Sequence, residues 1–289
     1  MLRSLLSLGR TPDYLFPKVD PTQDGPDCLK DCADCTTQFP DKVKIETSRP
    51  LYGHIKEFHS HVLVATGRSD WKEKVGQEKG SLMEAFDEGS AKSRLGRIMV
   101  SASNIQPLDH SGDNSTPTTV LILPAFTFVD SVSQADVPDL VNRYIDNYDE
   151  KIDKSIVTPD AGMNARPCEL DYVVLLCSHR RRDARCGITA PLIKRELERH
   201  LRPLGLDRDA DDSRPGGVGI FFVSHVGGHK FSANVLVYRK KNQQMIWLAR
   251  VKPEHCEGLV KYTILEGKVV HPESQLRGGF DRVRGLTSW

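Results

Sequence analysis

The sequence has no long hydrophobic run, no large net charge and no internal repeat. Its longest mainly apolar stretch, residues 120–129, is shorter than the ~18 residues that cross a bilayer, and it contains Pro124. Lysine and arginine total 40 against 39 aspartates and glutamates, so the chain has no overall field that would attract nucleic acid. We therefore expect neither a membrane nor a nucleic acid as its partner.

Several familiar motifs are also missing. There is no P-loop, no Rossmann glycine fingerprint and no nucleophile elbow, which removes the usual signs of nucleotide binding or serine-type hydrolysis. Seven cysteines, an odd number, do not suit the disulfide framework of a small secreted protein. We predict a cytoplasmic location. The first ten residues include Arg3 and Arg10 and no acidic residue, which is compatible with a short mitochondrial presequence as the alternative.

The length favours two domains, since one domain has roughly 100–200 residues. Residues 1–50 are rich in Pro, Asp and Cys and predict an irregular, Cys-containing arm. Residues 51–160 predict an N-terminal α/β domain, and residues 161–289 predict a second domain. In the N-terminal domain, hydrophobic spacing predicts strands over 61–66, 97–101 and 119–129, and helices over 80–93 and 136–148.

The second domain shows a clearer order of elements. An apolar strand over 170–176 ends at Cys177, and a strand over 217–224 ends at His225. Further segments predict a helix over 188–201, strands over 234–238 and 245–249, and a closing helix over 253–265. Strand, helix, three strands and a helix within about 120 residues are typical of a thioredoxin-like α/β domain. The predicted fold class is therefore α/β, in a two-domain chain with a C-terminal domain of this type.

Four candidate ligands for a metal lie where these elements end: Cys177, Cys186, His225 and His229. Cys186 comes just before the predicted helix, where backbone N–H groups favour a thiolate. If the two strands are neighbours, all four side chains reach the carboxyl-end edge of the sheet, where ligands usually bind. Two thiolates and two imidazoles suit either a tetrahedral zinc ion or a 2Fe–2S cluster. The spacing alone leaves both open, because Cys-x8-Cys is long for zinc whereas His-x3-His suits it.

The residues around these ligands form two recognisable motifs, CSHRRRDARCG over 177–187 and SHVGGHKFSAN over 224–234. With DCADC over 31–35, HVLVATG over 61–67, Asp70-Trp71, EKGS over 78–81 and RGG over 277–279, the chain resembles the sucrase/ferredoxin-like family, also called thioredoxin-like ferredoxins. One departure is Ser232-Ala233, where relatives often have Ala-Gly.

The resemblance implies a thioredoxin-like domain that holds a 2Fe–2S cluster through Cys177, Cys186, His225 and His229. It implies an electron-transfer protein that serves cellular redox homeostasis. The expected partner is an unidentified redox protein, and the chain is expected to be a carrier rather than an enzyme. One alternative is a zinc-stabilised interaction module linked to the actin cytoskeleton. Another is a thiol oxidoreductase that uses Cys177 and Cys186.

Two further features carry predictions of their own. Cys28, Cys32 and Cys35 suggest either a zinc site that needs a fourth ligand, such as His54, or a labile dithiol. The C-terminal Trp289, preceded by Ser288, resembles the tripeptide through which some cytosolic iron–sulfur proteins are recognised by their assembly machinery, which would then be a second partner.

Overall fold

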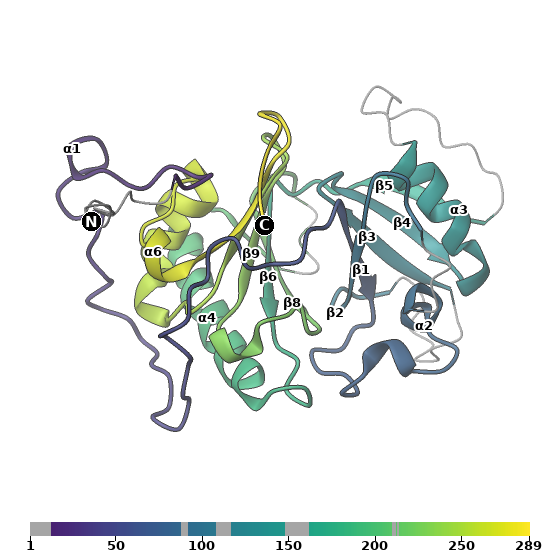
Figure 1. Cartoon of the computed structure of the whole chain (residues 1–289), viewed down its shortest axis with the longest axis horizontal. Helices are drawn as coiled ribbons and strands as arrows, with labels where there is room; N and C mark the ends of the chain where they lie inside the picture. Colours follow the sequence, from purple (N-terminus) through teal and green to yellow (C-terminus); the bar gives the residue numbers. More distant parts are fainter. Residues whose placement is uncertain (1–12, 88–91, 108–116, 148–161, 210–211, 213) are drawn as a thin grey trace, which may run out of the picture.

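The computed structural model describes residues 13–87, 92–107, 117–147, 162–209, 212 and 214–289. Its strands join into a mixed sheet in the order β12-β11-β10-β9-β6-β8-β2-β1-β3-β4-β5, with β7 beside β8. Helices cover both ends of the molecule (Figure 1). The prediction of a mixed α/β fold is therefore confirmed.

The N-terminal half supplies one end of this sheet. Its strands are β1 (Ser60–Ala65), β2 (Ile98–Ser103), β3 (Thr118–Leu123), β4 (Thr127–Val132) and β5 (Asn164–Pro167). Its helical elements are α1 (Pro21–Asp24), η1 (Val75–Gln77), α2 (Leu82–Asp87), η2 (Gln134–Asp136), α3 (Val137–Val141) and the π-helical η3 (Asn142–Asp146).

The single strand predicted over 119–129 is wrong, because β3 and β4 form a hairpin. Pro124 has no N–H to donate to a strand ladder. Phe126 has a φ of 51° and so turns the chain between the strands. The run looks continuous in the sequence because residues 120–126 are all apolar, so no polar residue marks the turn.

The C-terminal half supplies the rest of the sheet. Its strands are β6 (Tyr172–Cys177), β7 (Asp207–Arg208), β8 (Val218–Val223), β9 (Val235–Arg239), β10 (Gln244–Leu248), β11 (Leu276–Asp281) and β12 (Leu286–Ser288). Its helical elements are α4 (Ala184–Leu201), η4 (Arg202–Leu204), η5 (His229–Phe231), η6 (Pro253–His255), α5 (Cys256–Gly258), the π-helical η7 (Leu259–Ile264) and α6 (Pro272–Gln275).

The predicted helix over 188–201 begins earlier, at Ala184. Asp183 is its N-cap, and its carboxylate accepts a hydrogen bond from the backbone N–H of Arg185. The basic residues before Ile188 concealed this start, since they interrupt the apolar pattern. Cys186 therefore lies within the first turn of α4 and not before it, which corrects the prediction.

The alternation of side chains along the strands separates two layers of core. Val174 and Leu176 of β6 pack with α4 and the C-terminal helices, whereas Val173 and Leu175 pack with strands of the N-terminal half. The far side of β1 and β3 packs on α2 and α3. From one side of Figure 1 to the other, the layers are therefore the C-terminal helices, the C-terminal part of the sheet, the N-terminal part of the same sheet, and α2 with α3.

The two halves share polar as well as apolar contacts. β2 meets β8 where Ser103 pairs with Val223. The buried His61 ring contacts the Tyr238 hydroxyl through Nδ1 and Ser101 Oγ through Nε2, each at 2.9 Å. The predicted domain boundary near residue 160 lies outside the described residues, as do Arg3 and Arg10, so the division into an arm and two domains stays a prediction.

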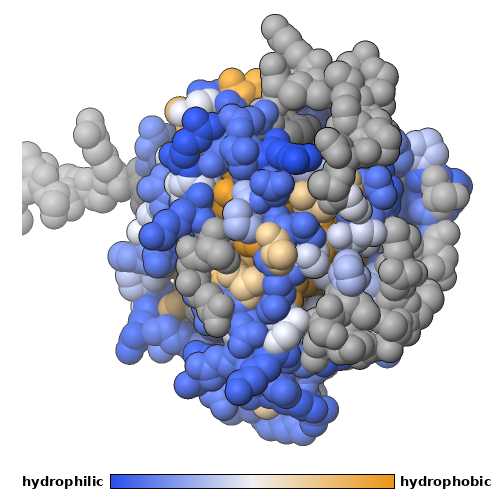
Figure 2. Space-filling view, turned by 90° about the vertical axis from the view of Figure 1, so that its right-hand side faces the viewer, coloured by the Kyte–Doolittle hydropathy of each residue, from blue (hydrophilic) through white to orange (hydrophobic). Residues whose placement is uncertain are grey.

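The outer face of the N-terminal half is mostly hydrophilic, with a few hydrophobic residues at the surface near its centre (Figure 2). None of the helices in the described parts of the chain has the length and apolar character needed to cross a membrane.

Candidate metal centre

The strand arrangement brings the two ligand-bearing segments to one edge. β6 and β8 are parallel neighbours, and Cys177 pairs with Val223 at their carboxyl ends. His225 follows two residues after Val223, and His229 opens the 3₁₀ turn η5. The expectation that these two strands are neighbours is thus confirmed.

The two cysteines form a buried pair, each with 1% of its surface exposed. The Cys177 thiol hydrogen-bonds to Cys186, which raises the pKa of Cys177 well above its usual value, and burial acts in the same direction. The same contact lowers the pKa of Cys186, with help from the Ser232 hydroxyl 3.3 Å away. The first thiolate of the pair therefore forms at Cys186, in the first turn of α4, where backbone N–H groups favour negative charge.

The two histidines form the second pair, with ring centroids 5.1 Å apart and the rings edge to face. Gly227 and Gly228 lie between them with φ of 100° and 72°, as the predicted turn requires. The Nδ1 atom of His225 is buried and has no hydrogen-bond partner. Burial and the neighbouring His229 lower the pKa of His225 to about 4, so it is neutral at pH 7. A buried imidazole nitrogen without a partner is what a metal ligand looks like without its metal.

Asp183 connects the histidine pair to α4. Its carboxylate accepts hydrogen bonds from Nδ1 of His229 and from the backbone and guanidinium of Arg185. Burial opposes ionisation, but the bonds from Arg185 and His229 outweigh it and lower the pKa of Asp183. Asp183 thus keeps the His229 proton on Nδ1 and leaves the Nε2 lone pair free for a metal.

Both ring nitrogens of His179 make hydrogen bonds to the backbone, so this residue supports the candidate ligand His225. Its Nε2 donates to the backbone carbonyls of Trp71 and Lys72, at 3.1 and 2.9 Å. Its Nδ1 accepts the backbone N–H of His225 at 3.3 Å. The buried ring therefore ties the turn that carries His225 to a loop of the N-terminal half.

Arg277 supports the turn formed by Gly227 and Gly228. Its Nη1 donates to the Gly227 carbonyl and to Asn234 Oδ1, each at 3.0 Å, and its guanidinium lies 4.5 Å from the Trp247 ring centroid. Burial lowers the pKa of Arg277 to about 10. Its place in the RGG motif is the one sequence signal that points to Arg277, and that motif alone does not indicate this supporting role.

The basic loop between the two cysteines is largely neutralised. Arg181 lies 3.6 Å from Asp70, Arg182 lies 3.7 Å from Glu73, and Arg185 lies 2.7 Å from Asp183. These arginines hold the loop to its neighbours rather than presenting bare positive charge to the metal site.

The donor set fits a two-iron cluster better than one zinc ion. A tetrahedral zinc ion needs four donor atoms within about 4 Å of one another. Within the described residues, the four predicted ligands form no group of three whose donor atoms all lie within 4.8 Å. A 2Fe–2S cluster with two histidines takes its ligands as a thiolate pair on one iron and an imidazole pair on the other. The observed thiol pair and imidazole pair match that pattern.

The N-terminal cysteines separate into two places. Cys28 packs with Val19 and Tyr262, whereas Cys32 contacts Cys35. The side chains grouped with Cys32 are His200 and Glu257 and do not include His54, so the suggestion of His54 as fourth ligand is not supported.

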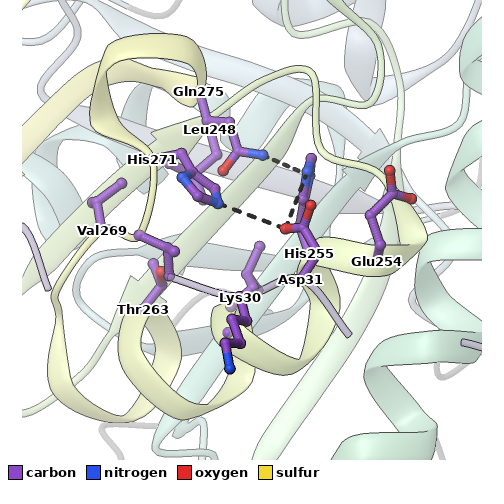
Figure 3. Close-up of a pocket in the computed structure, with 12 residues that line it drawn as sticks. Lys30, Asp31, Leu248, Glu254, His255, Thr263, Val269, His271 and Gln275 are labelled. Atoms are coloured by element: carbon purple, nitrogen blue, oxygen red, sulfur yellow. Dashed lines mark hydrogen bonds and ion pairs between the residues drawn. The ribbon is translucent and has the colours of Figure 1, made fainter. Parts of the chain in front are cut away.

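A small pocket lies beside this segment, between the arm and the C-terminal helices (Figure 3). In it, Asp31 Oδ1 lies 3.9 Å from His255 Nε2 and 3.6 Å from His271 Nε2. Gln275 contacts the other nitrogen of His255 at 2.6 Å. The carboxylate of Asp31 thus helps to attach the arm to the C-terminal half.

The C-terminal Trp289 packs back onto the protein. Its ring centroid lies 5.2 Å from that of Phe58 and 5.9 Å from that of Phe280. The indole Nε1 is buried without a hydrogen-bond partner. Recognition of this residue by another protein would therefore require its release from this site.

Comparison with known proteins agrees with the motifs. The family model described as "Sucrase/ferredoxin-like" matches residues 51–278. Actin patches distal protein 1 of Saccharomyces cerevisiae is 34% identical over 250 residues, which cover 80% of this chain and 79% of that relative. Altered inheritance of mitochondria protein 32 of Clavispora lusitaniae is 32% identical over 250 residues, covering 80% and 85%. No solved structure matches. The chain therefore belongs to the sucrase/ferredoxin-like family.

Proposed function

We propose that this chain is an electron-transfer protein whose 2Fe–2S cluster is held by Cys177, Cys186, His225 and His229. The observation that carries the proposal is the meeting of a buried thiol pair and an imidazole pair at one edge of the sheet. The Nδ1 atom of His225 supports the proposal, because it is buried and has no hydrogen-bond partner, so its lone pair is free to bind a metal.

The strand order supports a thioredoxin-like domain around this site. Neighbouring strands run β8-β6-β9-β10, with β8 parallel to β6 and with β9 and β10 each antiparallel to its neighbour. The helix α4 connects the two parallel strands. This is the order expected of the predicted strand–helix–strand, strand–strand core.

When bound, the cluster supplies one-electron chemistry at a potential above that of four-cysteine clusters, because neutral histidines replace two anionic thiolates. The surrounding residues orient the two histidines. Asp183 holds the proton on His229 Nδ1, and His179 fixes the backbone of His225. The side chain of His229 is 40% exposed, which gives a partner protein a surface route to the metal site.

The other two functions have less support. A thiol oxidoreductase needs an accessible nucleophilic thiol, but Cys177 and Cys186 are each 1% exposed. A zinc-stabilised module needs four close donors, which the predicted ligands do not provide. The relatives' names refer to actin patches and to mitochondrial inheritance. For this chain we propose a role in cellular redox balance on the basis of the metal ligands, in the cytoplasm or, as the alternative, in mitochondria.

The direct test is chemical analysis of the full chain purified without oxygen. We expect two irons and two acid-labile sulfides per chain, with visible absorption that bleaches on reduction. Cys177→Ser or His225→Ala should remove the iron, whereas Cys168→Ala, at a buried cysteine outside the site, should keep it. A colourless wild-type protein that contains zinc at these four residues would refute the proposal.

A further inference from the structure

A second cluster of metal-binding side chains lies at the other end of α4 from Cys186. His200 is near the last residue of this helix, Glu257 belongs to α5, and Cys32 and Cys35 come from the arm. A donor atom from each of Cys32, His200 and Glu257 lies within 4.8 Å of the others. Cys32 Sγ is 3.9 Å from His200 Nε2, and the thiol of Cys32 hydrogen-bonds to Cys35.

The neighbouring arginine shows how the histidine is oriented. Arg199 Nη2 lies 3.0 Å from His200 Nε2 and 3.3 Å from Cys32 Sγ. A guanidinium has only donors, so His200 Nε2 is the acceptor. Its lone pair on the side of the cysteine accepts the Arg199 N–H in this structure, and a bound metal ion would displace that N–H. An imidazole lone pair next to two thiols is a donor set for a metal ion.

We propose that Cys32, His200 and Glu257 bind a zinc ion, and that Cys35, which lies outside this close group but contacts Cys32, is drawn in as the fourth ligand. With Zn–S near 2.3 Å and Zn–N near 2.0–2.1 Å, a tetrahedral ion holds sulfur and nitrogen about 3.6 Å apart, close to the 3.9 Å observed. Thiolate and imidazole ligands select zinc over magnesium or calcium, which prefer oxygen. Two thiolates, one carboxylate and Zn²⁺ leave one negative charge, which the adjacent Arg199 balances.

The surrounding contacts give the ion a structural role. The backbone N–H of Cys32 donates to the Glu254 carbonyl at 2.9 Å. Thr36 and Thr37 both donate to the buried carboxylate of Glu196 on α4, at 3.0 and 3.1 Å. The arm is therefore already held against η6 at Cys32 and against α4 just after Cys35, and a zinc ion would strengthen this attachment.

The adjacent pocket of Figure 3 is a poorer place for a metal. The Nδ1 atom of His255 accepts the backbone N–H of Lys252 at 3.0 Å. The neutral ring therefore carries its proton on Nε2, which faces Asp31. A nitrogen that holds a proton cannot bind a metal, so Asp31, His255 and His271 attach the arm by polar contacts while Cys32 faces the zinc site.

The test is metal analysis of the full chain expressed with added zinc and purified without oxygen. We expect about one zinc per chain in the wild type and also in Cys177→Ser/Cys186→Ser, which lacks the cluster thiols. Cys32→Ser/Cys35→Ser should lose the zinc, and His200→Asn should weaken zinc binding at least about tenfold in a chelator competition. Cys28→Ser is the matched control, because that cysteine packs elsewhere, and it should keep the zinc.

Cobalt substitution adds a readout of the ligands themselves. Bound Co²⁺ should give tetrahedral d–d bands and a thiolate charge-transfer band, which Cys35→Ser should weaken to roughly half because one of two thiolates is lost. Retention of the iron in the variants at Cys28, Cys32, Cys35 and His200 shows that the chain has folded. Zinc content unchanged by Cys32→Ser/Cys35→Ser would overturn the proposal, as would a zinc-free wild type with a disulfide between Cys32 and Cys35.

Discussion

Asp183 accepts a hydrogen bond from Nδ1 of His229 although the two residues are 46 positions apart. The same carboxylate caps the helix that carries Cys186. One side chain therefore sets the orientation of a ligand from each pair, and it adds a negative charge beside the proposed cluster.

Asp183→Asn should raise the reduction potential of the cluster. Removal of this negative charge makes the addition of an electron easier, and the weaker hydrogen bond makes His229 a poorer donor to iron. We expect a rise on the order of 50 mV, since 59 mV is a tenfold change for a one-electron couple. Protein-film voltammetry measures it, with Asp171→Asn as the control for a general loss of surface charge. No difference between the two variants would show that Asp183 does not act on the metal.

His229→Cys should retain a cluster of lower potential. A thiolate in place of a neutral imidazole adds one negative charge to the ligand set, which opposes reduction. A fall of about 100 mV or more is expected, because histidine-ligated centres lie several hundred millivolts above four-cysteine ferredoxins. An unchanged potential in a variant that still contains iron would mean that His229 is not a ligand.

Gly228→Ala should disrupt the turn between the histidines. A Cβ at this position would lie 2.6 Å from Arg277 Nη1, and the φ of 72° disfavours any side chain. Gly205→Ala is the matched control, because its φ is 67° but nothing lies within 4 Å of the added atom. We expect Gly205→Ala to cost about 1 kcal/mol and Gly228→Ala more than that, with loss of iron. Urea unfolding and iron analysis of both variants measure the contrast.

His61 should make the protein less stable in mild acid. Burial lowers its pKa to about 3 in the folded chain, whereas an unfolded histidine has its usual value near 6.5. Below a pH of about 6.5, the unfolded state takes up a proton that the folded state excludes. The free energy of unfolding therefore falls as the pH drops toward 3, by about 1.4 kcal/mol per pH unit from this residue. Urea unfolding at about pH 7 and about pH 5 should show a smaller loss in His61→Gln than in the wild type. Equal losses would contradict this assignment.

Deletion of Trp289 should lower the free energy of unfolding, in addition to abolishing any recognition by an assembly factor. Its ring packs on Phe58 and Phe280, and such aromatic contacts contribute about 1 kcal/mol beyond the area they bury. Thermal unfolding of the purified protein tests this part alone, since no other protein is present. A melting temperature equal to that of the wild type would show that the packing is not stabilising.

The motifs around the metal site could be predicted because their signal is local. Strand ends, two glycines and four ligands lie within short stretches, and the parallel pairing of β6 with β8 brings them to one edge. The supports could not be predicted, because they join distant segments. His179 contacts Trp71 although the two residues are more than a hundred positions apart in the sequence, and Cys32 is still farther in sequence from His200, which it also contacts. The hairpin of β3 and β4 could not be predicted for another reason: the residues between the strands, 124–126, are apolar like those before them, so no polar residue marks the turn.

The loop that carries the first ligand pair rests on the N-terminal half. Ser178 Oγ donates to the Ser69 carbonyl at 2.6 Å, and Arg181 lies beside Asp70. A fragment that begins at Met163 would keep the four candidate ligands but would lose these two contacts with the N-terminal half. The shortest fragment that could keep the proposed cluster site in this arrangement is therefore longer than the segment that supplies its four donor atoms, and it has to include residues 69–70 of the N-terminal half.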